Sequence, residues 1–270
     1  MDAMAQIAAG GVTLLGCGKM GGAMLEGWLA GGLPPEAVTV IDPAPSDRLQ
    51  ALAGRGLRLN PAEAPSSAVC LLAVKPQMME AALPAVAGKA GTLFLSIAAG
   101  LSLDWFAARL GPAPLIRAMP NTPAAVGRGI TALIGNAAAT EAQLVLAEAL
   151  LGAIGETVRL GAEDQMDAVT AVSGSGPAYV FLMIESLAAA GAAQGLPEDL
   201  AMRLARATVC GAGELAHRAP EAAAQLRVNV TSPGGTTAAA LGVLMAEDGL
   251  DPLMARAVAA AAARSRELGG

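Results

Sequence analysis

Aromatic, charged and metal-binding side chains are all scarce in this 270-residue sequence. Aromatic residues make up 2% of the chain, which argues against a platform for stacking single-stranded nucleic acid. Charged residues make up 15%, and 17 Lys and Arg against 23 Asp and Glu give a formal net charge of -6. This balance argues against a basic nucleic-acid-binding face or a polybasic membrane anchor. We therefore expect a protein that binds neither nucleic acid nor a membrane.

Cysteine and histidine are too few for a metal centre or a disulfide framework. Cys17, Cys70 and Cys210 are odd in number and form no Cys-x-x-Cys pair, and His217 is the only histidine. Such a set predicts neither a zinc site nor disulfide bonds, and it suits a reducing compartment. No Lys or Arg precedes Lys19, so the basic segment of a secretory signal is missing. We expect a cytoplasmic protein without a bound metal.

Apolar residues are abundant, at 54% of the chain, and the mean hydropathy is +0.52. This is ample to bury the core of one large or two ordinary domains. The uncharged run 228–246 has the length of a membrane-spanning helix, but it contains Asn229, Thr231, Ser232, Pro233 and an adjacent pair of glycines. A segment this polar and this broken is not expected to span a bilayer.

Two halves with different patterns follow one another along the chain. The first alternates short apolar runs with helix-like segments, the pattern of a largely parallel sheet covered on both faces. The expected strands are 12–15, 38–41, 69–74, 92–97, 115–119, 130–134 and 157–160. The expected helices between them include 20–30, 78–86 and 103–110. After Gly161 helical stretches begin near Asp164, Pro177, Pro197 and Thr236. We therefore predict an α/β domain over residues 1–161 and an all-α domain over residues 162–270.

A glycine-rich loop, Gly16-Cys17-Gly18-Lys19-Met20-Gly21, joins the first expected strand to the first expected helix. In a dinucleotide-binding turn the first glycine permits the tight turn, the second admits the pyrophosphate and the third allows close helix packing. The helix N-terminus then faces the anion. The loop predicts a Rossmann-like, dinucleotide-binding domain, with a ligand-free strand-to-helix turn as the alternative. Cys17 fits here as a small side chain and not as a reactive thiol.

Asp42 ends the second expected strand, where an acidic residue accepts hydrogen bonds from the adenosine ribose hydroxyls. This position points toward NADH. Arg48 follows a few residues later and has the charge to meet a 2′-phosphate, although an exposed helix arginine is the more ordinary explanation. The preference between NADH and NADPH stays open.

Two further loops follow expected strands of the first half. Ala73-Val74-Lys75-Pro76 places a cation at the carboxyl end of a buried strand, where open α/β sheets bind their ligands. Lys75 is either a cofactor ligand or an ordinary solvated loop lysine. Met119-Pro120-Asn121-Thr122-Pro123 breaks the chain after another strand, and its two prolines favour a fixed loop able to close against a nicotinamide ring.

Two loops stand out in the second half. Residues 230–237 read Val-Thr-Ser-Pro-Gly-Gly-Thr-Thr just before an expected helix. Free N–H groups and the positive end of the helix dipole suit a substrate carboxylate there. The alternative is a helix start at which Ser or Thr caps its own backbone. Residues 173–177 interrupt an apolar run, and a turn between helices with Pro177 at the start of the second one explains them.

Taken together, five motifs resemble those of the pyrroline-5-carboxylate reductase family: GCGKMG, LAVKP, MPNTP, DAVTAVSGSGPAY and VTSPGGTT. Their order and spacing match along nearly the whole chain, and the combination with SPGGTT is highly specific. The resemblance implies that the imine of Δ1-pyrroline-5-carboxylate is reduced to L-proline by NADPH or NADH, the last step of proline biosynthesis. It also implies a Rossmann domain followed by an all-α dimerisation domain, in a homodimer that often builds a larger ring of dimers.

The resemblance, together with the position of Asp42, assigns residues to the two ligands. The predicted cofactor-binding residues are Gly16, Cys17, Gly18, Lys19, Met20, Gly21, Asp42, Asn60, Ala73, Val74, Lys75, Pro76, Ala98, Ala99 and Asn229. The predicted substrate-binding residues are Glu163, Val230, Ser232, Gly234, Gly235 and Thr236. The Thr237 hydroxyl is predicted to reach the ring nitrogen as the catalytic group. The family often has Ser, Thr, Asn or Arg where this chain has Asp42-Pro43, which puts the usual NADPH preference in doubt.

Two other functions agree less well with the sequence than imine reduction does. A β-hydroxyacid dehydrogenase shares the two-domain plan but uses a helical lysine as acid/base, and all three lysines, Lys19, Lys75 and Lys89, lie in the first half. A non-enzymatic NAD(P)-binding scaffold has no need of the hydroxyl-rich loop 232–237. A protonated cyclic imine is already electrophilic, so a chain with one histidine suffices. The apolar stretches 241–245 and 253–263 favour dimerisation of the second domain.

Overall fold

The computed structural model describes residues 2–269, which form two compact units. The first unit contains the chain up to Gly174 and again from Ala262 onward, and the second contains Ser175–Ala261. The sequence pattern changes earlier, at Gly161, because residues 162–174 are already helical although they pack in the first unit. The functional boundary at Gly161 stays a prediction.

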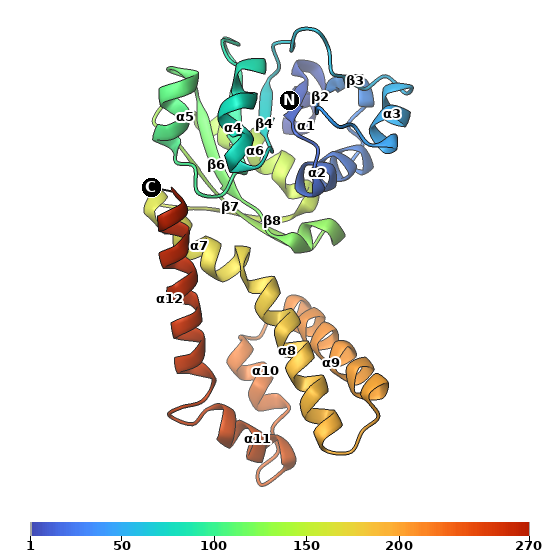
Figure 1. Cartoon of the computed structure of the whole chain (residues 1–270), viewed down its shortest axis with the longest axis vertical. Helices are drawn as coiled ribbons and strands as arrows, with labels where there is room; N and C mark the ends of the chain where they lie inside the picture. The colour runs from blue at the N-terminus through green and yellow to red at the C-terminus, as the bar shows by residue number, and fades with distance from the viewer. Residues whose placement is uncertain (1, 270) are drawn as a thin grey trace. The chain divides into compact units, whose positions relative to one another are not determined.

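An eight-stranded sheet forms the centre of the first unit, in the order β3-β2-β1-β4-β5-β6-β7-β8 (Figure 1). All neighbouring strands are parallel except β6 and β7. The strands are β1 Val12–Leu15, β2 Val38–Ile41, β3 Arg58–Leu59, β4 Val69–Leu72, β5 Leu93–Ser96, β6 Leu115–Met119, β7 Gly129–Gly135 and β8 Gly155–Arg159. The order of the first six is that of a Rossmann fold, so the predicted fold class is confirmed.

Helices cover both faces of this sheet because successive side chains of a strand point to opposite faces. Leu14 packs into one buried cluster with Trp28, and Leu15 packs into a second cluster with Phe94 and Phe106. The helices are α1 Ala3–Gly10, α2 Lys19–Ala30, α3 Asp47–Ala53, α4 Pro76–Ala82, α5 Leu103–Leu110 and α6 Glu141–Leu151. The long apolar runs predicted as strands therefore are strands buried on both sides.

Several expected elements have different ends in the structure. The strand predicted to reach Val74 ends at Leu72, in register with Leu15 where β1 also ends. The helix predicted over 78–86 is the α-helix α4 followed by a 3-10 turn, η2 Leu83–Ala85. Pro84 lies in that turn, and a proline cannot donate the hydrogen bond that would continue an α-helix. The remaining shared strands differ from prediction by at most two residues at either end.

A continuous helical run leaves the sheet after β8. It begins with the 3-10 turn η5 Glu163–Gln165, continues through α7 Met166–Val169 and widens into a π-helical turn, η6 Thr170–Gly174. The break expected between helices at 173–177 is limited to one residue, Ser175: the backbone stays helical through Gly174 and is helical again from Gly176, with Pro177 in the first turn of the next helix, as predicted. Proline is tolerated there because first-turn N–H groups have no partner within the helix.

The second unit is entirely helical within the part of the chain that the structure describes. It comprises α8 Gly176–Ala193, α9 Glu198–Arg218, α10 Ala223–Asn229, α11 Thr236–Leu244 and most of α12 Leu250–Gly269. Helices α8 and α9 pack against each other as a hairpin (Figure 1). Their buried side chains are alanines, Ala188, Ala201 and Ala205, while Phe181 and Leu182 are about 60% exposed, at 59% and 60%. This unit leaves its large apolar side chains uncovered.

Candidate cofactor and substrate site

The three glycines after β1 each meet a different steric limit. Gly16 has a φ of 87°, and a Cβ there would lie 2.6 Å from Cγ1 of Val74. A Cβ on Gly21 would lie 2.5 Å from the carbonyl oxygen of Gly16, whereas a Cβ on Gly18 would have no atom within 4 Å. The first and third glycines are therefore required by the fold, and the middle one borders open space. This is the division of roles expected of a pyrophosphate-binding loop.

The loop leads into α2, whose N-terminus is free of side-chain caps. Gly18 is the N-cap residue, and no side chain accepts from the first turn. The N–H groups of that turn and the positive end of the helix dipole therefore remain for an anion. Lys19 is exposed at the same helix start and adds a positive charge. These residues fit the pyrophosphate of a dinucleotide.

Cys17 lies in this loop with a thiol of low reactivity. Burial raises the pKa of the thiol to about 11, and the carboxylates of Asp42 and Glu26 contribute in the same direction. A thiol with this pKa is protonated near neutral pH. Only the deprotonated thiolate is a good nucleophile or metal ligand, so Cys17 is suited to neither role. Among residues 2–269, no group of three or more His, Cys, Asp or Glu is arranged to hold a metal ion.

Asp42 and Asn60 form a network that holds the loop against the end of β2. Asp42 Oδ2 accepts from the backbone N–H of Cys17 at 2.7 Å, and Oδ1 accepts from that of Ala44 at 2.9 Å. Asn60, with a φ of 45°, accepts from the Asp42 N–H and donates to the Asp42 carbonyl, both at 2.8 Å. Two predicted cofactor residues from separate strand ends are thus brought together.

The other predicted cofactor residues of the first unit follow β4 and β5. Ala73 donates its N–H to the carbonyl of Leu15 at 2.8 Å, which keeps the end of β4 beside the glycine loop. Lys75 is exposed and immediately precedes α4, which starts at Pro76. After β5, Ala98 is buried and Ala99 is exposed. Because parallel strands end at one edge of a sheet, these segments share the edge that carries the glycine loop.

The proline-bounded loop after β6 is fixed by its asparagine. Asn121 is buried, and its Oδ1 accepts from the N–H of Ile130 at 3.0 Å, which ties the loop to β7. A 3-10 turn, η3 Thr122–Val126, follows immediately. The prediction of a rigid segment here agrees with this geometry, whereas its closure against a nicotinamide ring remains a prediction.

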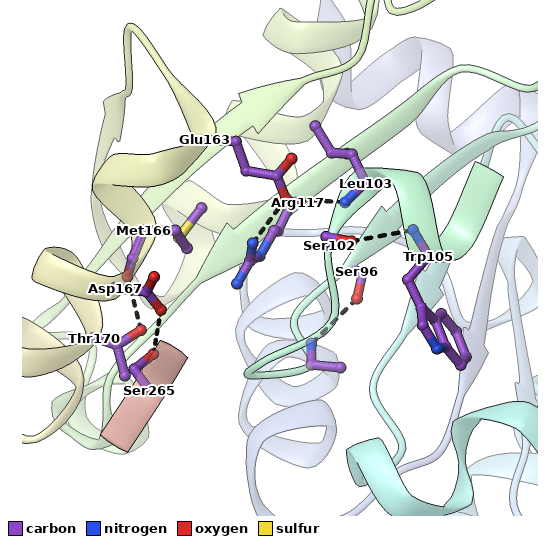
Figure 2. A network of polar contacts seen from close by, with 11 residues as sticks. Ser96, Ser102, Leu103, Trp105, Arg117, Glu163, Met166, Asp167, Thr170 and Ser265 are labelled. Carbon is purple, nitrogen blue, oxygen red and sulfur yellow. Dashed lines mark hydrogen bonds and ion pairs between the residues drawn. The ribbon is translucent and has the colours of Figure 1, made fainter. Parts of the chain in front are cut away.

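Glu163, predicted to bind substrate, is held by two donors in the first unit (Figure 2). Its Oε1 accepts from Nη1 of Arg117 at 2.7 Å and from the N–H of Leu103 at 2.9 Å. The Arg117 side chain is 9% exposed, so this ion pair is largely buried. Nearby, the Ser265 hydroxyl lies 2.6 Å from Oδ1 of Asp167. Glu163 therefore joins β6, the start of α5 and η5.

A cavity of about 330 Å³ lies beside this ion pair, and it is lined by Gly100, Ser102, Arg117, Glu163, Asp164, Asp167 and Arg266. Sequence reasoning missed Arg117. The signal was present, because Arg117 is the only charged residue within the apolar strand Leu-Ile-Arg-Ala-Met. A charge buried in a strand requires a partner, and that partner, Glu163, is distant in sequence.

The loop before α11 belongs to the second unit, and no side chain caps the helix. Gly235 is the N-cap residue, its N–H donates to the Ser232 carbonyl at 3.0 Å, and Gly234 has a φ of 69°. The alternative of a Ser or Thr capping its own helix start is therefore wrong for this structure. Thr236 is exposed and Thr237 is partly buried in the first turn. The N–H groups there remain available to a carboxylate.

Asn229 and Val230 lie at the end of α10, just before this loop. Both are exposed, and Asn229 Oδ1 accepts from Gln225 Nε2 at 2.8 Å. They belong to the second unit, as do Ser232 to Thr237, whereas Glu163 and the predicted cofactor residues from Gly16 to Ala99 belong to the first. The structure thus gathers the predicted residues into two sets, one on each unit.

A Rossmann sheet with a glycine loop and an uncapped helix at its first crossover is typical of the class of dinucleotide-binding proteins. Family models support this class. Residues 11–100 match the model described as NADP oxidoreductase, coenzyme F420-dependent. Residues 163–268 match the model for pyrroline-5-carboxylate reductase dimerisation.

Known proteins agree over the length of the chain. The pyrroline-5-carboxylate reductase of Pseudomonas aeruginosa is 40% identical over 263 residues, 95% of this chain and 96% of the relative. That of Synechocystis is 48% identical over 204 residues, 75% and 76% of the two chains. The structure of the Coxiella burnetii reductase has a TM-score of 0.89 at 34% identity, covering 97% and 99%. The Plasmodium falciparum pyrroline carboxylate reductase, solved with NADP bound, has a TM-score of 0.79 at 27% identity, covering 96% and 98%. The chain belongs to the pyrroline-5-carboxylate reductase family and is an NAD(P)-dependent oxidoreductase.

Proposed function

We propose that this protein reduces the carbon–nitrogen double bond of Δ1-pyrroline-5-carboxylate to give L-proline, with NADPH or NADH as the hydride donor. The observation that carries the proposal is a pair of uncapped helix starts, one after a glycine loop and one after a hydroxyl-rich Gly-Gly loop. The first suits a pyrophosphate and the second a carboxylate, which are the anionic groups of this cofactor and this substrate. Membership of the pyrroline-5-carboxylate reductase family indicates the reaction in which this cofactor and this substrate take part.

The first unit supplies the cofactor site. The backbone of Gly16 to Gly21 receives the pyrophosphate, and Asp42, Asn60, Ala73 to Pro76 and the Ala98-Ala99 turn border the rest of the dinucleotide. Asn229 of the second unit is assigned to the nicotinamide end. The bound cofactor supplies a hydride from nicotinamide C4. The role of these residues is to hold that carbon in register with the imine carbon, which is the main source of rate in a reaction between two bound molecules.

Residues of the second unit receive the substrate. The backbone of Ser232 to Thr236 binds the carboxylate, the Thr237 hydroxyl contacts the ring nitrogen, and Val230 lines the ring. The iminium nitrogen carries its own proton, so no histidine base is needed. Glu163, on the first unit, is also assigned to the substrate, with Arg117 fixing one of its oxygens and leaving the second free of hydrogen bonds to the described residues.

The proposal is tested by following the absorbance of NADPH, and separately of NADH, when purified protein meets pyrroline-5-carboxylate near neutral pH. Oxidation of the cofactor with formation of proline is the expected result. Cofactor binding without turnover would instead favour a scaffold, and turnover of a 3-hydroxy acid would favour the β-hydroxyacid dehydrogenase alternative.

Thr237→Ala tests the catalytic assignment. We expect kcat/KM to fall by the equivalent of about 1–3 kcal/mol, the cost of a hydrogen bond lost in a desolvated site. Thermal stability should stay near that of the wild type, because no side chain caps α11. Thr237→Ser retains the hydroxyl and is expected to recover most of the rate. An unchanged rate in Thr237→Ala would remove this residue from the mechanism.

We further propose a cytoplasmic homodimer, formed through residues 162–270 and open to assembly into a larger ring. The exposed apolar side chains of the second unit support a dimer. They include Val180, Phe181, Leu182, Met183 and Leu187 on α8 and Val243 and Leu244 on α11. Within the described residues, one helical run, 163–193, is long and apolar enough to cross a membrane by length and composition, and few of its residues are buried. An intersubunit surface accounts for the same exposed residues.

A further inference from the structure

The end of β2 carries a carboxylate with hydrogen-bonding capacity to spare. Each oxygen of Asp42 accepts one backbone N–H, from Cys17 at 2.7 Å and from Ala44 at 2.9 Å. A carboxylate oxygen has two lone pairs, so both oxygens retain one for a further donor. Asn60 fixes the Asp42 backbone from both sides. The carboxylate is thus held in place and is still able to accept hydrogen bonds from two hydroxyl groups.

Arg48, the cation that follows β2, is already paired. Its Nε lies 2.7 Å from Oε1 of Glu26, and its Nη2 lies 2.9 Å from Oε2, a bidentate contact between α3 and α2. This pairing occupies one of the two guanidinium edges with which an arginine can hold a phosphate, and the carboxylate offsets the charge of Arg48. Glu26 therefore competes with any phosphate for Arg48.

Glu26 and Asp42 both act on the glycine loop. Asp42 accepts from the Cys17 N–H of the loop at 2.7 Å, and Glu26 lies on α2, the helix that begins in the loop. After the larger effect of burial, both carboxylates raise the pKa of the Cys17 thiol. A phosphate on the adenosine ribose would bring up to two further negative charges into this region. Like charges at short range repel, most strongly where water is partly excluded.

We propose that the end of β2 selects NADH over NADPH, with Asp42 accepting from the ribose hydroxyls and Glu26 withholding Arg48 from a 2′-phosphate. The inference rests on the proposed use of a nicotinamide dinucleotide, and it adds which of the two dinucleotides, NADH or NADPH, the protein prefers. It assigns Asp42 as the specificity-determining ligand and Glu26 as a residue that acts through Arg48.

Calorimetric titration tests this specificity without any turnover. The probes are ADP-ribose and 2′-phospho-ADP-ribose, which share the pyrophosphate and differ by one phosphate. We expect the wild-type protein to bind ADP-ribose at least tenfold more tightly. The kcat/KM ratio of NADH to NADPH should favour NADH by a similar factor.

Glu26→Gln isolates the Arg48 contribution, because it removes a charge without altering Asp42. Since Glu26 and Arg48 are about half exposed, at 49% and 54%, the pair is weak, and we expect a gain of about twofold to fivefold for the 2′-phosphorylated probe alone. The double variant Glu26→Gln with Arg48→Met should lose that gain. Glu80→Gln, which breaks the exposed Arg109–Glu80 pair elsewhere on this unit, is the matched control and should leave both affinities unchanged.

Asp42→Ser removes the carboxylate while retaining a hydroxyl that accepts one backbone N–H. We expect weaker binding of ADP-ribose and a probe ratio shifted about tenfold or more toward the 2′-phosphorylated form. A wild-type preference for 2′-phospho-ADP-ribose, or a ratio that neither Asp42→Ser nor Glu26→Gln changes, would overturn the inference and leave the reductase proposal intact. Failure of the wild-type protein to bind either probe would instead refute the proposed use of a dinucleotide, and this inference with it.

Discussion

Gly18 and Gly21 belong to the same loop but differ in the space around them. An added Cβ meets open space at position 18 and a backbone oxygen 2.5 Å away at position 21. Backbone atoms move aside less readily than the end of a flexible side chain. A glycine at position 21 is therefore needed for folding, whereas one at position 18 is needed only for binding. In such a loop, a glycine that borders open space is required by the ligand, and one whose added Cβ would touch backbone is required by the fold.

Gly21→Ala is therefore expected to destabilise the protein by about 1–3 kcal/mol, the range for an overpacked contact. For Gly18→Ala, the free energy of unfolding should lie within about 0.5 kcal/mol of the wild-type value. This variant should bind ADP-ribose more weakly, because the added Cβ would occupy space through which the pyrophosphate approaches. Urea unfolding and calorimetric titration measure the two effects. Equal loss of stability in both variants would contradict this division.

At the level of elements, one ion pair connects three segments of the first unit. Arg117 of β6 and the first N–H of α5 converge on a single oxygen of Glu163 at the start of the helical run that follows β8 (Figure 2). The Arg109–Glu80 pair between α5 and α4 offers a contrast, because Arg109 is 32% and Glu80 74% exposed. Burial decides how much each pair contributes.

Arg117→Met is expected to lower the free energy of unfolding by about 2–4 kcal/mol, because Glu163 loses its charged partner in a largely buried place. Arg109→Met should cost only about 1 kcal/mol, because it removes an exposed ion pair and a cation–π contact of Arg109 with the Trp105 ring at 3.9 Å. Adding Glu163→Gln to Arg117→Met should recover part of the loss, since it removes the unpaired charge. Chemical denaturation of the four proteins provides the measurement, and equal effects of the two arginine variants would contradict the expectation.

A second contact between elements is sensitive to pH. Arg159 of β8 bonds to Glu148 of α6 at 2.7 Å and to Glu141 at 2.7 Å. The hydrogen bond from Arg159 holds the pKa of Glu148 below its usual value of 4.5. A carboxyl with a lowered folded pKa stabilises the fold above its unfolded pKa, and this contribution is lost as the pH falls through the folded value.

We therefore expect Glu148→Gln to be less stable than the wild type at pH 7, and the difference to shrink progressively below about pH 4.5. Glu63→Gln is a useful comparison, because the Lys89 contact lowers the pKa of Glu63 in the same way but Glu63 is 86% exposed, against 27% for Glu148. It should show a smaller difference throughout. Unfolding curves recorded between pH 3 and pH 7 would measure both, and a Glu148→Gln difference that is constant with pH would count against the assignment.

At the level of the whole molecule, the second unit is the part that leaves large apolar side chains exposed. Alanines fill the contact between α8 and α9, while Phe181 and Leu182 remain about 60% exposed at 59% and 60%. Small side chains allow close helix packing but bury little apolar area per residue. The match of residues 163–268 to a dimerisation model is consistent with a second chain covering these faces.

Light scattering at micromolar concentration should therefore give at least twice the chain mass of 26.6 kDa. Leu182→Glu is expected to shift the protein toward a monomer and lower its stability, because it places a charge in the covered surface. Val145→Glu, at a 43% exposed position on α6 of the first unit, is the matched control and should leave the mass unchanged. A monomeric wild type would refute the homodimer.

Much of the first unit was predictable from local pattern. Short apolar runs mark buried strands, and all seven predicted strands fall within two residues of their observed ends, with the strand 69–74 shorter by two. The two-residue strand β3 and the π-helical turn at Thr170–Gly174 were beyond such reasoning. A strand that short has no readable alternation, and the turn depends on how the run packs on its neighbours.

The sequence by itself determined the fold class, the glycine loop and the family, because these depend on short local motifs and on their order along the chain. Tertiary structure decided which residues act on one another. Asp42 with Asn60, Glu26 with Arg48, and Arg117 with Glu163 are pairs separated by 18, 22 and 46 positions. Their pairing follows from strand order and helix packing, which bring distant carboxylates, amides and guanidinium groups together and leave no periodic signal in the chain.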